Sequence, residues 1–247
     1  MKIAVLSDIH GNMDALEEVL KDLKKERCEK VFVLGDYAMA GPEPETIVNW
    51  AYAKIDDPTY SLIQGNTDLM IADYTPELRQ KMESVAPVMA EALSDDVVQL
   101  NQNQKEFLKN LPPKLEIEIE GVKFLLVHGS PRRNNEDILP DTPVKQVETM
   151  LDGVNADVVL CGHTHIPCGF QTASRKTVVN VGSVGRPFTP EPKACYLVIT
   201  VSNGKCIFNH KFVEYNKERA ALKLRGRKFV GSAKLANTLL NPKFRHF

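Results

Sequence analysis

Short runs of β-branched and other apolar residues, bounded by glycine and polar residues, recur along the chain. Such runs are typical of buried strands. They occupy residues 3–6, 31–34, 61–63, 115–119, 122–127, 158–160, 177–181, 196–201 and 206–213. The early runs alternate with helical stretches, as in βαβ units, whereas the late runs follow one another through short turns such as residues 202–204. The pattern predicts an α/β protein in which two sheets pack together with helices outside.

Two further regions are predicted to be helical. Residues 13–25 carry Leu16, Val19, Leu20 and Leu23 at helical intervals. Residues 68–112 are charged and punctuated by prolines, and we predict two or three helices there that cover one edge of the site. We therefore expect one main domain over residues 1–216, with a helical insert at about 69–112, and a separate tail over residues 217–247.

The tail is basic, with nine Lys or Arg residues against Glu218 alone. We predict that it is helical and has a solvated basic face, and we favour this over a polyanion-binding role because charge runs are usually solvated. The residues predicted to dock it are Leu222, Leu224, Phe229, Leu235 and Leu239.

Composition excludes several classes of protein. A formal charge of −1 and a hydrophobic fraction of 43% describe an ordinary globular chain with nothing that points to nucleic acid. No apolar run approaches the roughly 20 residues that cross a bilayer, and the N-terminus does not resemble a signal peptide. Five cysteines without CxxC spacing argue against a disulfide framework or a zinc ribbon. We expect a reduced, cytoplasmic protein with no membrane partner.

Polar side chains follow the predicted strands at the points where those strands end. They are Asp8 and His10, Asp36 after Gly35, Asn66 after Gly65, His128 before Gly129, and the pair His163 and His165 after Gly162. The carboxyl ends of parallel strands are where open α/β sheets bind ligands. In Asp8-Ile9-His10, the period of a strand would turn both polar side chains the same way. Their O and N donors suit a divalent transition ion.

Two Asp, one Asn and four His are too many donors for one four-coordinate zinc. Judged singly, His10 or His128 fits a core or capping histidine, but four of the six histidines share this placement. The set favours two ions that share a bridging carboxylate. Two metals about 3.5–4 Å apart are a known device for in-line displacement at phosphorus.

The series DxH, GD, GN, HG and GHxH, in this order, resembles the calcineurin-like metallophosphoesterase superfamily over about residues 1–186. The resemblance implies a four-layer αββα sandwich of two mixed β-sheets flanked by helices, and hydrolysis of small phosphate esters by metal-activated hydroxide. It implies that one ion is held by Asp8, His10 and His165, the other by Asn66, His128 and His163, with Asp36 bridging. Mn²⁺ is the favoured ion, and Fe, Zn, Ni or Co are alternatives.

The same resemblance assigns further roles. Asp36, Asn66, His128 and Asn12 are expected to be catalytic, and Asn12, Thr67 and Arg186 to contact substrate. Residues 180–187 look like the NPGSVG-type element of small prokaryotic phosphodiesterases, although Val181 stands where proline is usual. Taken alone, this segment is a glycine-rich loop whose amides and Arg186 could cradle an anion, or a tight turn between strands.

Position 67 departs from the GNH sequence of many monoesterases and protein phosphatases in this superfamily, where the histidine helps the leaving group depart. Threonine cannot act as a general acid near neutral pH. Thr67 therefore favours a phosphodiesterase acting on a small ester, nucleotide-like esters included. A phosphomonoesterase, a dinucleoside-polyphosphate hydrolase and a non-catalytic scaffold are the alternatives, and a scaffold would be expected to lose some of its histidines. The oligomeric state is left open.

Overall fold

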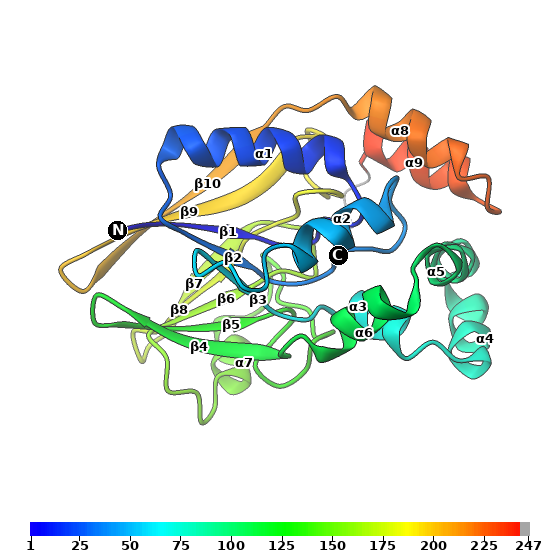
Figure 1. Ribbon diagram of the computed structural model, residues 1–247. Coiled ribbons are helices and arrows are strands. Elements are labelled where there is room, and N and C mark those ends of the chain that lie inside the picture. The colour runs from blue at the N-terminus through cyan, green and yellow to red at the C-terminus, as the bar shows by residue number, and fades with distance from the viewer. Residues whose placement is uncertain (243–247) are drawn as a thin grey trace.

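Two five-stranded sheets pack face to face, with helices on both outer sides, in the computed structural model, which describes residues 1–242 (Figure 1). The first sheet has the order β10-β9-β1-β2-β3 and the second β4-β5-β6-β8-β7. The strands of the first sheet are β1 (Lys2–Leu6), β2 (Lys30–Val33), β3 (Tyr60–Leu62), β9 (Ala194–Ser202) and β10 (Lys205–Val213). Those of the second are β4 (Lys114–Ile119), β5 (Val122–Val127), β6 (Val158–Cys161), β7 (Cys168–Gln171) and β8 (Thr177–Asn180). The predicted four-layer fold is confirmed.

Both sheets are mixed. Strands β1, β2 and β3 are parallel, and β9 joins β1 antiparallel with Ile3 opposite Ile199. In the second sheet β5, β6 and β8 are parallel, whereas β4 and β7 are antiparallel edges. The parallel strands therefore end at the same side of the molecule, at the right in Figure 1.

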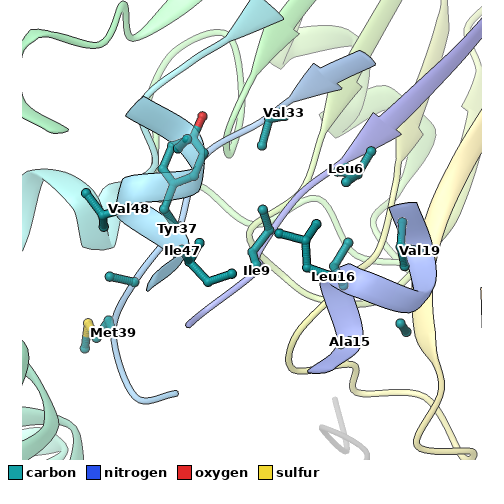
Figure 2. Packing of buried hydrophobic residues seen from close by; sticks show 14 of the residues in the cluster. Leu6, Ile9, Ala15, Leu16, Val19, Val33, Tyr37, Met39, Ile47 and Val48 are labelled. Carbon is teal, nitrogen blue, oxygen red and sulfur yellow. The ribbon is translucent and has the colours of Figure 1, made fainter. Parts of the chain in front are cut away.

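The core explains why the strand sequences are so continuously apolar. In β1, Ile3 and Val5 pack between the sheets, while Ala4 and Leu6 face the outer helices. A strand that is covered on both faces needs apolar residues at every position. Figure 2 shows the outer cluster, in which Leu6 and Ile9 lie among residues of the strands and of helices α1 (Met13–Glu26) and α2 (Pro44–Tyr52). Helix α7 (Val144–Met150) covers the other sheet.

The insert contains more helix than expected. Four helices occupy it, where two or three were predicted: α3 (Asn66–Ala72), α4 (Pro76–Val85), α5 (Pro87–Gln99) and α6 (Gln102–Asn110). The extra helix is short and begins at Asn66 itself, so it was hidden behind the motif. Two of the prolines that punctuate the insert, Pro76 and Pro87, are the first residues of α4 and α5, a position that suits proline.

The tail is helical as far as residue 242, with α8 (Lys217–Gly226) and α9 (Ser232–Leu240). Leu224, Leu235 and Leu239 are buried, but the docking role predicted for Leu222 is wrong because that side chain is 70% exposed. The basic face is also less solvated than predicted, since Lys223 pairs with Asp14 and Glu43. The predicted tail continues over residues 243–247, which lie outside the described residues.

Two further expectations concern the whole chain. All five cysteines are free thiols. Within residues 1–242, no helix combines the length and the apolar character that crossing a bilayer requires.

Candidate metal centre

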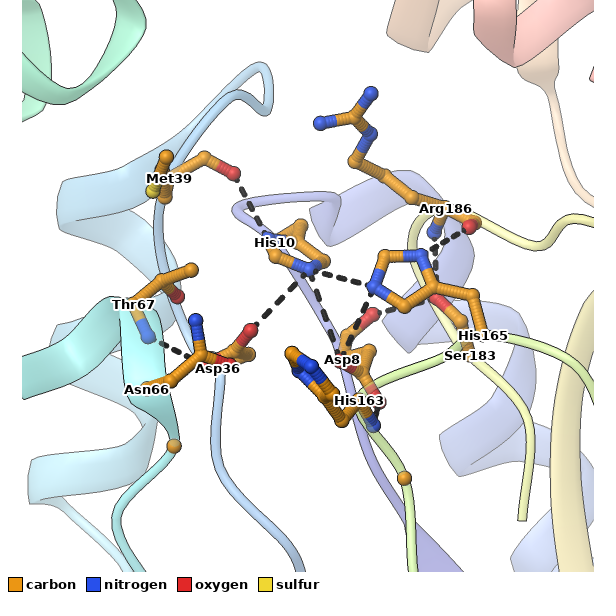
Figure 3. Close-up of polar contacts among 12 residues, drawn as sticks. Asp8, His10, Asp36, Met39, Asn66, Thr67, His163, His165, Ser183 and Arg186 are labelled. Carbon is orange, nitrogen blue, oxygen red and sulfur yellow. Dashed lines mark hydrogen bonds and ion pairs between the residues drawn. The ribbon is translucent and has the colours of Figure 1, made fainter. Parts of the chain in front are cut away.

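Loops at the carboxyl ends of five strands bring the predicted ligands together. Asp8 and His10 follow β1, Asp36 follows β2, Asn66 opens α3 just after β3, His128 follows β5, and His163 and His165 follow β6. Asp8, Asp36 and His128 are each no more than 2% exposed. In Figure 3 the labelled members of this set converge on one space: Asp8, His10, Asp36, Asn66, His163 and His165. A parallel arrangement of the strands is what makes this convergence possible.

The loops reach this geometry through left-handed backbone. The φ angles are 55° at Asp8, 47° at His10, 56° at Asp36, 67° at His163 and 63° at His165. The strand period invoked for Asp8-Ile9-His10 is therefore the wrong explanation, since β1 has already ended at Leu6. Left-handed non-glycine residues cost of order 1–3 kcal/mol each and persist where surrounding structure holds them. Their concentration here indicates a functional site.

Backbone carbonyls orient three imidazoles in the same way. Nδ1 of His10 lies 2.9 Å from the Met39 oxygen, Nδ1 of His128 lies 2.6 Å from the Leu34 oxygen, and Nδ1 of His165 lies 2.6 Å from the Arg186 oxygen. A carbonyl only accepts, so each Nδ1 must carry the proton and donate it. In the neutral form of each imidazole, Nε2 therefore presents a lone pair to the centre of the site, which is the usual arrangement of metal-binding histidines.

Asp8, His10 and His165 form the first group of possible ligands. Nε2 of His165 lies 3.1 Å from Oδ1 of Asp8 and 3.1 Å from Nε2 of His10. Oδ1 of Asp8 is buried and has no hydrogen-bond partner among the described residues. Two lone pairs and a bare carboxylate oxygen directed at one point are unfavourable without a positive charge between them. This group fits a cation.

Asp8, Asp36 and His128 form the second group. Nε2 of His128 lies 3.4 Å from Oδ2 of Asp36 and 3.0 Å from Oδ1 of Asn66. The same Oδ2 atom lies 3.6 Å from Nε2 of His10. Asp36 therefore stands between the two groups.

His163 lies at the margin of this cluster. Its ring centroid is 5.3 Å from that of His128, but its Nε2 is directed at Asp137, 3.3 Å from Oδ1. Its Nδ1 is the atom left for the centre. Asp137 was not recognised in the sequence, because it lies in a loop far from any strand end.

Electrostatics in the site favour positive charge. Burial lowers the pKa of His10 to about 4, so its imidazole is neutral at pH 7. Burial would also lower the pKa of His128, yet Asp36 and Asp8 outweigh it and raise that pKa to about 10. For Asp36, burial is opposed by His128, which lowers the carboxyl pKa to about 2. The two carboxylates thus create a field that retains a proton or another cation.

Asp68 is a functional residue that sequence reasoning missed. Its buried carboxylate accepts hydrogen bonds from the backbone N–H groups of Gly65, Asp36 and Tyr37, at 2.8, 2.8 and 3.0 Å. It therefore ties the loop that carries Asp36 to the start of α3. Burial, with the Asp36 charge, raises the pKa of Asp68 to about 7. The signal was an acidic residue three positions after Gly65, which is the spacing of a helix-capping box.

Asn12, which was expected to contact substrate, has bonds within the protein. Its side chain is fully buried, accepts from the N–H of Ala15 at 3.1 Å and donates to the Gly185 oxygen at 2.9 Å. The amide thus caps α1 and fastens the glycine-rich loop, a role that Asn commonly takes just before an amphipathic helix. Contact between the second Nδ2 hydrogen and a phosphate stays a prediction.

Backbone amides of residues 180–187 that were candidates for anion binding are hydrogen-bonded within the protein. The N–H groups of Val184 and Gly185 donate to the oxygens of Ser7 and Asp8, and that of Arg186 donates to Oγ of Ser183. These bonds brace the loop that carries Asp8. Only the side chain of Arg186 remains for an anion.

Arg186 and Thr67 lie beside the converging ligands. The Arg186 side chain is 8% exposed, extends past His10 and His165 in Figure 3, and reaches Sδ of Met89 at 4.0 Å. Burial lowers its pKa to about 10, which leaves it charged at neutral pH, and no carboxylate pairs with it among residues 1–242. Thr67 donates its N–H to Oδ1 of Asp36 at 2.9 Å and its hydroxyl to the Ala38 oxygen at 3.3 Å.

Comparison with known proteins gives a consistent result. Residues 1–204 match the family model of the calcineurin-like phosphoesterase superfamily domain. An uncharacterized protein of Methanocaldococcus jannaschii is 29% identical over 246 residues, covering 90% of this chain and 91% of the relative. A hypothetical protein of Pyrococcus horikoshii has a crystal structure that superposes with a TM-score of 0.86 at 25% identity, covering 98% of this chain and 99% of the other. A metallophosphoesterase of Sphaerobacter thermophilus shares the fold, with a TM-score of 0.78 at 22% identity over 98% of this chain and all of the other.

Proposed function

This chain belongs to the calcineurin-like phosphoesterase superfamily, and from that premise we propose that it is a phosphodiesterase that acts with two divalent metal ions. One observation carries the proposal above the others. Three imidazoles whose Nδ1 atoms are fixed by backbone carbonyls turn their Nε2 atoms toward two buried carboxylates. A protein builds such an arrangement to hold cations.

The donor set supports an assignment of the ligands. Asp8, His10 and His165 would hold one ion, Asn66, His128 and the Nδ1 side of His163 would hold the other, and Asp36 would be shared between them. Mixed imidazole and carboxylate donors suit Mn²⁺, with Fe, Zn, Ni or Co as alternatives. Bound there, the ions supply Lewis-acid activation of water and neutralise charge on the phosphoryl oxygens.

The chain's own residues orient the ester. Arg186 is a buried cation that pairs with no carboxylate in the described part of the chain, so a phosphoryl oxygen is its natural partner. Thr67 holds Asp36 in place through its backbone N–H. The Thr67 hydroxyl offers a leaving group at most a hydrogen bond, because it cannot donate its proton near pH 7.

Absence of an acid at position 67 favours diesters with good leaving groups. Positioned acid catalysis is worth about 10²–10⁴-fold, and an alkyl monoester depends on it more than an aryl diester does. A monoesterase is the second candidate, because the unpaired charge of Arg186 suits a dianion.

The test compares bis(p-nitrophenyl) phosphate with an alkyl phosphate monoester, using purified protein and Mn²⁺. The proposal predicts a larger kcat/KM for the diester, and loss of both activities with a chelator. Faster turnover of the monoester would favour the second candidate. If the protein hydrolysed no phosphate ester with Mn²⁺, Fe, Zn, Ni or Co, the proposed activity would be wrong. The non-catalytic scaffold would then be the remaining alternative.

We also propose a cytoplasmic location, which is supported by five free cysteines in a chain that builds no disulfide. Fractionation of the native host would test it, and recovery from an oxidising compartment would contradict it.

A further inference from the structure

The turn that orients His10 is strained. Met39 and Ala40 both have left-handed backbone, with φ angles of 79° and 59°, although neither is glycine. The oxygens of Ala38 and Met39 accept from Nδ1 of His10, at 3.0 and 2.9 Å. Such a turn persists only where other groups hold it. The orientation of the His10 imidazole therefore depends on whatever holds residues 38–41.

One of those groups comes from the helical insert. Asp96, near the end of α5, is fully buried, and its Oδ2 accepts the N–H of Met39. The left-handed turn leaves this N–H without a helix or strand partner, so the carboxylate satisfies it. Burial raises the pKa of Asp96 to about 6 even though Arg227 opposes the shift. Because burial disfavours the charged form of Asp96, its carboxylate needs a positively charged partner.

The cation comes from the C-terminal segment. Arg227 directly follows α8, and its side chain is only 4% exposed. It donates to both Asp95 and Asp96 and also to the Gly41 oxygen, the last at 2.6 Å. The guanidinium thus connects two groups. One is the Asp96 carboxylate, which holds the start of the turn, and the other is the Gly41 carbonyl at the end of the turn.

Packing at the end of the turn is close. A Cβ at Gly41 would lie 1.5 Å from the backbone oxygen of His10. Residue 41 therefore rests directly on the backbone of the loop that carries Asp8 and His10. A displacement of the Gly41 carbonyl would be transmitted to that loop, because dense packing leaves no slack to absorb it.

We propose that Arg227 is a positioning residue of the metal centre: by bridging Asp96 and the Gly41 carbonyl, it fixes the Met39–Ala40 turn and hence the His10 imidazole. This inference rests on the proposed function only in taking His10 as a metal ligand. Arg227 lies beyond residues 1–204, which match the family model. The tail is therefore part of the site's construction, because the ion pair between Arg227 and Asp96 joins it to helix α5 of the insert.

The experiment measures Co²⁺ binding by calorimetry and by the visible d–d spectrum, which reports ligand geometry. The variants are Arg227→Met, Arg227→Lys and Asp96→Asn. Arg225→Met is the matched control, since Arg225 is an exposed arginine two residues earlier, in the last turn of α8. Thermal melts without metal show whether each variant is folded.

We expect Arg227→Met to weaken binding of one Co²⁺ ion about 10-fold, the lower end of what groups that orient metal ligands contribute, and to alter the d–d bands. Arg227→Lys keeps the charge and protects the fold, but one ammonium cannot make the two-sided bridge, so it should weaken binding less. Asp96→Asn should change the same bands. Arg225→Met should bind Co²⁺ as the wild type does.

Wild-type affinity and wild-type spectra in the folded Arg227 and Asp96 variants would overturn the proposal. So would an equal loss in Arg225→Met. If Arg227→Met fails to fold, Arg227→Lys and Asp96→Asn decide. A wild type that binds Co²⁺ but hydrolyses no phosphate ester would overturn the proposed function alone. In hydrolysis assays, a positioning role predicts a lower kcat with an unchanged KM.

Discussion

Strand β1 runs from an amino end held by exposed ion pairs to a carboxyl end lined by buried charges. At the amino end, Glu26 accepts from Lys2 at 2.9 Å and from Lys211 at 2.6 Å, and the two lysine side chains are 40% and 28% exposed. At the carboxyl end, Asp8 and Asp36 are buried beside imidazoles. Solvent screens the first kind of pair, so it contributes little either way. Burying the carboxylates at the carboxyl end costs free energy, and a bound cation offsets that cost.

Backbone conformation shows the same difference. Within residues 1–242, seven of the twelve left-handed non-glycine residues lie in loops at the carboxyl end: Asp8, His10, Asp36, Met39, Ala40, His163 and His165. Near the amino end, Arg27 is left-handed as the ordinary C-cap of α1. The carboxyl end thus combines strained backbone with buried charge, as functional sites commonly do, and the amino end does not. Substitutions at the two ends should therefore have opposite signatures.

Asp36→Asn should cause the largest loss of function at the carboxyl end of the strands. We expect at least a 100-fold loss of phosphoesterase activity, because replacing a ligand should cost no less than the roughly 10–100-fold seen for groups that only orient ligands. Stability without metal should change little, since the asparagine oxygen can still accept from the N–H of Thr67. Steady-state kinetics and urea melts measure both. Asp152→Asn, at an exposed aspartate, is the control, and similar activity in both variants would contradict the assignment of Asp36.

Mn²⁺ should stabilise the wild type through the carboxyl end alone. An ion present at 100 times its dissociation constant adds about 2.7 kcal/mol to the free energy of unfolding. Thermal melts with Mn²⁺ and with chelator should show this gain in the wild type and in Glu26→Gln. In Asp36→Asn the gain should shrink, and an undiminished gain there would place the binding elsewhere.

Thr67→His tests how the carboxyl end selects its substrate. A histidine supplies the missing acid, so turnover of an alkyl monoester should rise about 10-fold, within the range of positioned acid catalysis, while that of an activated diester stays nearly constant. Thr67→Asn introduces a polar side chain without a comparable acid and serves as the control. An equal gain in both variants would show that size, and not proton donation, matters at this position.

Glu26→Gln should have the smallest effect, confined to stability. Hydrogen bonds from Lys211 and Lys2 lower the pKa of Glu26 to about 2, below its ordinary value of 4.5. Its contribution is therefore present above pH 4.5 and is lost as the pH falls toward 2. Because the pair is partly exposed, we expect less than about 1 kcal/mol at pH 7. Urea melts from pH 7 down to about pH 2 should show the gap to wild type shrinking below pH 4.5, with Glu116→Gln as the control; a gap that grows in acid would reverse the assignment.

Much of the fold, and the convergence of the motif residues, could be predicted because the signals for both are local in the sequence. Apolar runs marked nine of the ten strands within residues 1–242, and the motif residues lie where those runs end. Strand β7 was missed because only alternate residues of this edge strand are partly buried. Leu222 was misplaced since helical spacing alone does not say which face of α8 meets the protein.

The groups that organise the site could not be predicted because they act across the chain. The carbonyl that orients His128 belongs to Leu34, and the one that orients His165 belongs to Arg186. The resemblance assigned Asn12 to substrate, but it gave no sign that the same amide donates to the Gly185 oxygen. Arg227 meets Asp96 only after the insert and the tail have packed together. Such contacts are properties of the tertiary structure.

Electron paramagnetic resonance of the Mn²⁺-loaded protein is the sharpest test of whether the site holds two ions bridged by Asp36. With two equivalents of Mn²⁺, a bridged pair should give the multiline spectrum of two exchange-coupled ions. In Asp36→Asn, uncoupled six-line signals should replace it. A single tightly bound ion, or two ions without coupling in the wild type, would contradict a bridged pair.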